Sequence, residues 1–180
     1  AVVTTPYLKF GANEVNNLAL NVATADSALR INGSVAHIKS GTSLDLYNAR
    51  INASAFNNNI DFRLGIDDKA GRTKYTLGGL LTQPQTGTFA LSLKPDSLLL
   101  NYAPWTIPAD NSITIGKTAI TAQNFVLGKE GQQLSIASVP GNGTDQPLQV
   151  KFTDFRLATI TGFIKPDSVL VDWVMNGVVN

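Results

Sequence analysis

The chain has 180 residues, of which 43% are hydrophobic and only 15% are charged, against roughly 25% in a typical soluble domain. Its net charge is +1 and its Lys and Arg residues are scattered singly, which argues against a nucleic-acid partner. Cysteine is absent, which excludes disulfides, thiolate metal sites and a cysteine nucleophile. Asn, Ser, Thr and Gly replace the missing charges, a composition typical of secreted or envelope β-proteins.

Apolar residues alternate with small or polar ones along most of the chain. The pattern runs through residues 18–22, 29–35 and 44–55, and it is cleanest in residues 60–66. A period of two places every apolar side chain on one face of a strand. Asp61, between Ile60 and Phe62, should therefore point to solvent.

The alternation resumes after each turn signal. Residues 67–72 predict a polar hairpin loop with Gly71 in the left-handed region, and about eleven to thirteen strands are expected over the whole chain. Residues 155–164 break the rhythm with helical spacing. They predict one short helix near residues 156–163, ended before Pro166.

The tetrapeptide Lys-Pro-Asp-Ser occurs twice, at residues 94–97 and 165–168, and Trp105 and Trp173 follow the two copies. Each copy reads as a turn that delivers the chain into a strand. Two units of about 70 residues would repeat around these turns, and coincidence is the alternative. We expect residues 1–180 to be a single β-groove segment of a longer protein.

The chain offers little for catalysis. His37 is the only histidine, so a triad or a metal cluster lacks partners. Most aspartates sit beside turn residues, and Asp67-Asp68 is too small an acidic pair for a calcium site. We expect no enzymatic activity, no cofactor and no metal. Trp105 and Trp173 would either stack on a sugar or else plug a groove end or cap a core, and the second interpretation is favoured.

The long apolar stripe is the feature that bears on function. A closed sandwich or barrel would bury it, whereas an open sheet would leave an apolar trough that needs a ligand. Sequence periodicity does not separate these two cases. If the sheet is open, the residues expected to line the groove are Ile60, Phe62, Leu64, Ile66, Tyr75, Leu77, Phe89, Leu91, Leu93, Leu98, Leu100, Ile113, Ile115, Phe125, Leu127, Leu134, Ile136, Val150 and Phe152.

Residues 60–138 carry a resemblance to a known family. The stretch 98–111 with its Asn101-Tyr102-Ala103-Pro104-Trp105 patch is followed by strand-like segments at 113–116, 120–127 and 131–136. Together they resemble the TamB branch of the AsmA-like envelope proteins, in its Bacteroidetes-type form. The tail, residues 152–157 and 167–171, is similar to that family's strand–helix–strand repeat.

The resemblance implies an all-β fold: an elongated, curled (taco-like) sheet with a hydrophobic concave interior. It implies a periplasmic location, with the full-length protein anchored in the inner membrane and reaching an outer-membrane barrel protein of the TamA/BamA type. The implied roles are conduction of phospholipid, whose acyl chains lie in the groove, and assistance to outer-membrane protein assembly. The alternative is an extracellular adhesin or carbohydrate-binding β-sandwich, which predicts a closed core and exposed aromatic residues.

Overall fold

The computed structural model describes residues 1–42, 44–140, 147–159 and 174–179. All regular elements in these ranges are strands, which confirms the all-β class. Their bounds are β1 Val2–Phe10, β2 Asn13–Ala25, β3 Ala28–Ser40, β4 Leu44–Phe56, β5 Asn59–Asp67, β6 Thr73–Gln85, β7 Thr88–Leu100, β8 Ala103–Pro104, β9 Ser112–Ile115, β10 Ile120–Gln123, β11 Phe125–Lys129, β12 Gln132–Ser138, β13 Leu148–Arg156 and β14 Val174–Val179.

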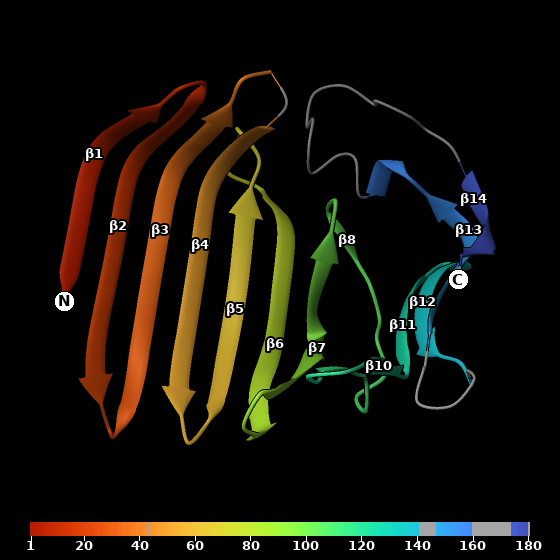
Figure 1. Ribbon diagram of the computed structural model, residues 1–180. Helices are drawn as coiled ribbons and strands as arrows, with labels where there is room; N and C mark the ends of the chain where they lie inside the picture. The colour runs from red at the N-terminus through yellow and green to blue at the C-terminus, as the bar shows by residue number, and fades with distance from the viewer. Residues whose placement is uncertain (43, 141–146, 160–173, 180) are drawn as a thin grey trace.

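The strands form two antiparallel sheets (Figure 1). The large sheet runs from β1 to β7 in chain order and continues through β9 to β10, with the two-residue β8 paired to β7. The small sheet has the order β11-β12-β13-β14. From β1 to β7, and again from β11 to β14, every strand therefore pairs with the next strand of the chain. Strands β1–β6 form an open layer on the left of Figure 1.

The large sheet has one apolar side, because its cross-strand partners match in chemistry. Partners in an antiparallel pair point to the same face. We call this side the apolar face and define it by three rows of partners: Val3, Leu20, Gly33, Ile51, Leu64, Leu77 and Leu98; Val22, Ile31, Ala53, Phe62, Gly79 and Leu93; and Leu29, Ala55, Ile60, Leu81, Leu91 and Ile113.

The opposite side, the polar face, carries hydrogen-bonding residues between these rows. One of its rows contains Asn21, Asn32, Asn52 and Arg63. Asp61 and Arg63 are exposed and Phe62 and Leu64 are half-buried, which confirms the predicted register of β5. Asp61 bonds to Lys94 of β7 at 2.5 Å along this face.

Strands β1–β4 bend along a common line near their upper ends (Figure 1). Pairing is interrupted there at one residue in each strand: Pro6, Asn17, Ala36 and Asn48, which stand in line across the sheet. Asn17 and Asn48 have φ of 51° and 46°, a left-handed conformation that Asn tolerates. The apolar positions change phase by one residue at this bend line, so that Val35 lies before it and Ile38 after it in β3. One extra residue per strand keeps the apolar side chains on one side of a bent sheet.

The hydrophobic core lies where the small sheet covers the end of the apolar face. It joins β7 to β11 and β13 and also takes two residues from the connection after β8. Its buried members are Leu93, Leu98, Trp105, Ile107, Phe125, Leu127 and Phe155. Phe155 is 1% exposed and contacts the rings of Trp105 and Phe152 at centroid distances of 5.6 and 5.7 Å. Trp105 therefore belongs to the core, as predicted.

Two local predictions fail. Arg156 is still the last residue of β13, and only residues 158 and 159 of the predicted helix are helical among the described residues, too few to form a helix; residues 160–163 lie outside them. Residues 94–97 form no turn but a large bulge inside β7, in which four residues stand opposite Gly78, since Leu77 pairs with Leu98 while Gly79 pairs with Leu93. Pro95 is exposed in that bulge, where its missing N–H breaks no ladder bond. The second copy, residues 165–168, lies outside the described residues.

Candidate functional site

The predicted groove residues fall into two sets. Those from β6 onward mostly pack against one another in or around the core: Leu77, Leu91, Leu93, Leu98, Leu100, Ile113, Phe125, Leu127, Leu134, Ile136 and Phe152. The others lie outside this core: Ile60, Phe62, Leu64, Ile66, Tyr75, Phe89, Ile115 and Val150. The structure thus closes one part of the predicted groove with the small sheet.

The apolar face loses its cover from β7 toward β1. Within a single row, Leu98 of β7 is 6% exposed, whereas Ile51 of β4 is 37% exposed. In the third row Leu29 of β3 is 41% exposed. No residue in β1–β4 reaches the buried class among the described residues. We call the part of the apolar face carried by β2–β5 the uncovered apolar face.

Two glycines allow side chains of the neighbouring strands to pack directly on the backbone of this face. A Cβ on Gly79 would lie 2.7 Å from Cζ of Phe62, so the Phe62 ring lies over the backbone of β6. A Cβ on Gly33 would lie 2.8 Å from Cγ2 of Ile51. Phe62 and Ile51 therefore occupy the space that a larger side chain at position 79 or 33 would fill. Their close packing on the backbone leaves the apolar surface flat and continuous.

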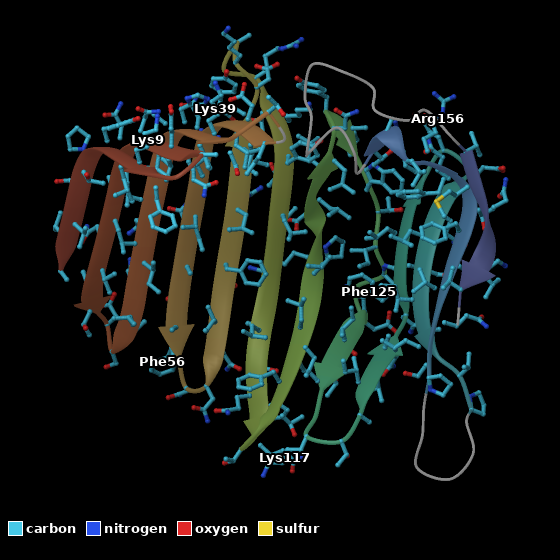
Figure 2. All side chains as sticks on the ribbon, turned by 45° about the horizontal axis from the view of Figure 1, so that its top comes forward. Lys9, Lys39, Phe56, Lys117, Phe125 and Arg156 are labelled. Atoms are coloured by element: carbon cyan, nitrogen blue, oxygen red, sulfur yellow. The ribbon has the colours of Figure 1, made fainter. Side chains whose placement is uncertain are left out.

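A hollow of about 680 Å³ lies at the lower end of this face, between the β2–β3, β4–β5 and β6–β7 turns. Its apolar wall contains Leu29, Ala55, Ile60, Leu81 and Phe89. Its remaining lining residues are Thr24, Ser27, Phe56, Asn57, Asn58, Asn59, Thr82 and Gln83. No charged side chain is among the lining residues that the structure describes. Figure 2 shows Phe56 at this end of the sheet.

Charges gather on the polar face and at the opposite end of the sheet. Arg50 of β4 makes two hydrogen bonds to Asp67 of β5, at 2.6 and 2.7 Å, and Thr73 adds one at 3.2 Å. The Arg50 guanidinium lowers the pKa of the Asp67 carboxyl below its usual range, against the effect of burial. In the following loop, hydrogen bonds from Tyr102 and from the backbone of Arg72 lower the pKa of Asp68 to about 2.

His37 takes part in a structural cluster above the bend line. Its Nε2 lies 2.5 Å from Oδ1 of Asp45, and its ring stacks on Tyr47 with centroids 4.6 Å apart. Asn16 contacts the other ring nitrogen at 3.4 Å. No group of three or more potential metal-binding His, Asp or Glu side chains is found among the described residues. These contacts hold β2, β3 and β4 together beyond the bend.

Sequence reasoning missed residues of both parts of the site. The rows through β2–β4 carry the same alternation as β5. Leu20, Ile31 and Ile51 therefore lie on the apolar face, although the predicted lining left them out. Ile107 and Asn111 lie in a connection without alternation, so no periodic signal marks them. Asn111 is 2% exposed and bonds to the backbone N–H and C=O of Leu93, both at 2.8 Å.

No helix of the described residues is long and apolar enough to cross a membrane. No family model matches the chain, and neither a curated protein nor a solved structure shows significant similarity to it.

Proposed function

We propose that the uncovered apolar face holds the acyl chains of phospholipid, and that the chain is a segment of a hydrophobic groove conducting lipid between the two membranes of a bacterial envelope. The observation that supports this most is the gradient of cover along one row, from buried Leu98 to Ile51 at 37% exposure. Exposed apolar patches larger than a few hundred Å² on soluble proteins usually have a ligand or a partner.

The size and chemistry of the face favour an acyl chain as its occupant. Strands β2, β3 and β4 have 13 residues each, a contour of about 40 Å at ~3.3 Å per residue. The three rows that define the face contain only aliphatic side chains, glycine and the ring of Phe62 before they reach the core. A protein partner would normally find polar anchors in such an area. A hydrocarbon chain needs none.

In this proposal the bend line and the covering sheet shape the groove. The bend in β1–β4 turns the upper part of the sheet relative to the lower part, and the small sheet stands over β7 and β9. A sheet curled in this way around acyl chains would have the taco-like form that the resemblance implies. The periplasmic location, the inner-membrane anchor and the outer-membrane barrel partner are part of the same proposal.

A second role, assistance to outer-membrane protein assembly, is favoured by exposed apolar side chains in β1. Val2, Leu8 and Phe10 of β1 are 73%, 54% and 80% exposed. Exposed apolar side chains on a strand can contact the strand of a client protein. The carbohydrate-binding alternative has less support, because Trp105 is 3% exposed and offers no stacking surface.

Nitroxide labels at Ile51 and at its neighbour Asn52 test the proposal, because the two residues lie on opposite faces. On addition of phospholipid vesicles, the label at position 51 should report a less polar environment and the label at position 52 should not change. A label at position 51 that stays as hydrated as the one at position 52 at every lipid concentration would contradict the proposal.

A further inference from the structure

A second pocket, of about 260 Å³, lies between the ends of β7, β11 and β13. Core residues Leu100 and Trp105 line it together with Lys129, Gln132 and Arg156. Asn101, Ala103, Ala158 and Thr159 complete its described lining. Figure 2 shows Arg156 at the upper end of the molecule, away from the uncharged hollow near Phe56.

Trp105 lines this pocket and carries a buried hydrogen-bond donor without an acceptor among the described residues. The residue is 3% exposed, and its Nε1–H has no hydrogen-bond partner among the described residues. An indole nitrogen can only donate a hydrogen bond. A buried donor without an acceptor is rare in folded proteins, and a bound ligand that supplies an acceptor would account for it.

The charged side chains of the pocket point to the same kind of ligand. The ion-pair partner of Lys129 within the described part of the chain is Glu130 at 3.8 Å, whose side chain is 80% exposed, so this pair neutralises the Lys129 charge weakly. Arg156 forms no ion pair with a described residue. No carboxylate is among the described lining residues. The pocket therefore offers two cations and donor groups to an acceptor-rich ligand.

We propose that this pocket binds a phosphate-type anion, held by Arg156 and Lys129 with the indole N–H of Trp105 as a third donor. Arginine recognises phosphate oxygens through paired hydrogen bonds, and lysine supplies a point charge. Leu100 and Trp105 connect the pocket to the hydrophobic core. An anion that carries an acyl chain would place its head here and its tail on apolar residues; this part of the inference rests on the proposed function.

Tryptophan emission can follow binding at this pocket directly. Trp105 and Trp173 are the only tryptophans, so a Trp173→Phe chain leaves Trp105 as the single reporter. Three probes separate the sources of the anion: inorganic phosphate, dodecyl phosphate and dodecyl maltoside, which has the same tail and no charge. Dodecyl phosphate should shift the emission of Trp105 and bind at least tenfold more tightly than dodecyl maltoside.

Variants assign the binding to named groups. Arg156→Gln and Lys129→Gln should each weaken dodecyl phosphate about tenfold, because each removes a charged hydrogen bond. Lys151→Gln is the matched control, an exposed lysine of β13 that does not line the pocket. Trp105→Phe keeps an aromatic ring and removes the donor. It also leaves a cavity in the core and should lower the unfolding temperature, and calorimetry well below that temperature should show weaker phosphate binding.

The outcomes distinguish the pocket from the uncovered apolar face. Equal affinity for inorganic phosphate and dodecyl phosphate would identify the ligand as a free anion and would support the pocket while giving the tail no role. Phosphate binding without any amphiphile binding would support the pocket and contradict the proposed function. Dodecyl maltoside binding as tightly as dodecyl phosphate, or an Arg156→Gln chain with unchanged affinity, would overturn the pocket and leave the apolar face standing.

Discussion

Arg50 and Asp67 form a two-point ion pair next to the bend line, with Nη1 to Oδ2 at 2.6 Å and Nη2 to Oδ1 at 2.7 Å. Arg50 lies in β4 just below Asn48, and Asp67 is the last residue of β5. Ladder pairing shifts between Tyr47 and Arg50, so the ion pair joins the two strands where the regular hydrogen bonds are interrupted. The ion pair therefore stabilises the bend on the polar face of the sheet.

The first prediction concerns this ion pair. Arg50→Ala should lower the free energy of unfolding by about 1–2 kcal/mol, because it removes two charged hydrogen bonds but leaves Thr73 bonded to Asp67. The side chain of Arg50 is 44% exposed, and solvent screening keeps the loss at the low end. Urea denaturation measures the change. Lys94→Ala, which breaks the exposed contact to Asp61, is the control and should change stability by less than about 0.5 kcal/mol.

The second prediction concerns acid. The pKa of Asp67 in the folded chain is lowered by Arg50, so its stabilising effect is complete above the unfolded value of about 4 and is lost as the pH falls through the folded value. Asp68, with a pKa of about 2, acts in the same direction. The unfolding free energy of the parent should therefore fall between about pH 4 and pH 2, and less steeply in Asp67→Asn. Parallel curves for the two chains would show that Asp67 does not control acid stability.

The third prediction concerns the closely packed backbone of β6. A Cβ at position 79 would lie 2.7 Å from the Phe62 ring and 2.8 Å from the carbonyl oxygen of Ser92, which cannot move easily. Gly79→Ala should lower the free energy of unfolding by about 1–3 kcal/mol, measured by thermal or urea denaturation. Gly65→Ala on the neighbouring strand is the matched control, since its nearest contact would be Arg50 Nη2 at an ordinary 3.6 Å. Equal stability of the two variants would mean that Phe62 does not pack over β6.

The fourth prediction concerns Asn111. Its side chain accepts from the backbone N–H of Leu93 and donates to the carbonyl oxygens of Leu93 and Pro108. Asn111→Ala should destabilise the chain by about 2–4 kcal/mol, because buried backbone groups of β7 lose their partners. The urea midpoint should fall with little change in slope. Asn52→Ala, an exposed amide on the polar face, should leave the midpoint nearly unchanged.

Much of the fold follows from local pattern, and the rest depends on long-range contacts. The alternation of Ile60, Phe62 and Leu64 predicts the strand and its register, and Gly71 with φ of 81° ends the hairpin as expected. The local preferences of Lys-Pro-Asp-Ser suit a turn and a bulge equally. The bulge forms because Leu98, just after the tetrapeptide, pairs with Leu77 of β6. In β4 the bend line shows in the sequence as a one-residue shift of the apolar alternation between Leu46 and Ala49. This shift identifies a bend only when the same shift is seen in the three strands beside it.

The site divides in the same way. An apolar face is predictable from period two, but the share of it that is covered is not. Trp105 and Ile107 reach the core from a connection without periodic signal, and they bring the small sheet over β7. Whether a leucine of the stripe lies in a core or on an open face therefore depends on the position of β11 and β13, which no local pattern encodes.

The fifth prediction uses one row of the apolar face as its own control. Leu98→Arg should unfold the chain, because the charge would enter the core, and Leu91→Arg and Leu100→Arg should destabilise it because both residues pack against that core. Ile51→Arg should change stability by about 1 kcal/mol or less, because the side chain can reach water. It should still reduce capture of phospholipid severalfold. Equal unfolding by Ile51→Arg and Leu98→Arg would mean that the face is closed in solution.

The most direct measurement is photo-crosslinking with a phospholipid that carries a photoreactive group in its acyl chain, followed by mapping of the modified residues by peptide mass spectrometry. Binding on the uncovered apolar face predicts modification at Leu20, Ile31, Ile51, Phe62 and Leu64, and none at Asn32, Asn52 or Arg63 on the polar face. It also predicts that unlabelled phospholipid competes for these sites. Modification spread equally over both faces, or the absence of any captured lipid, would contradict the proposed groove.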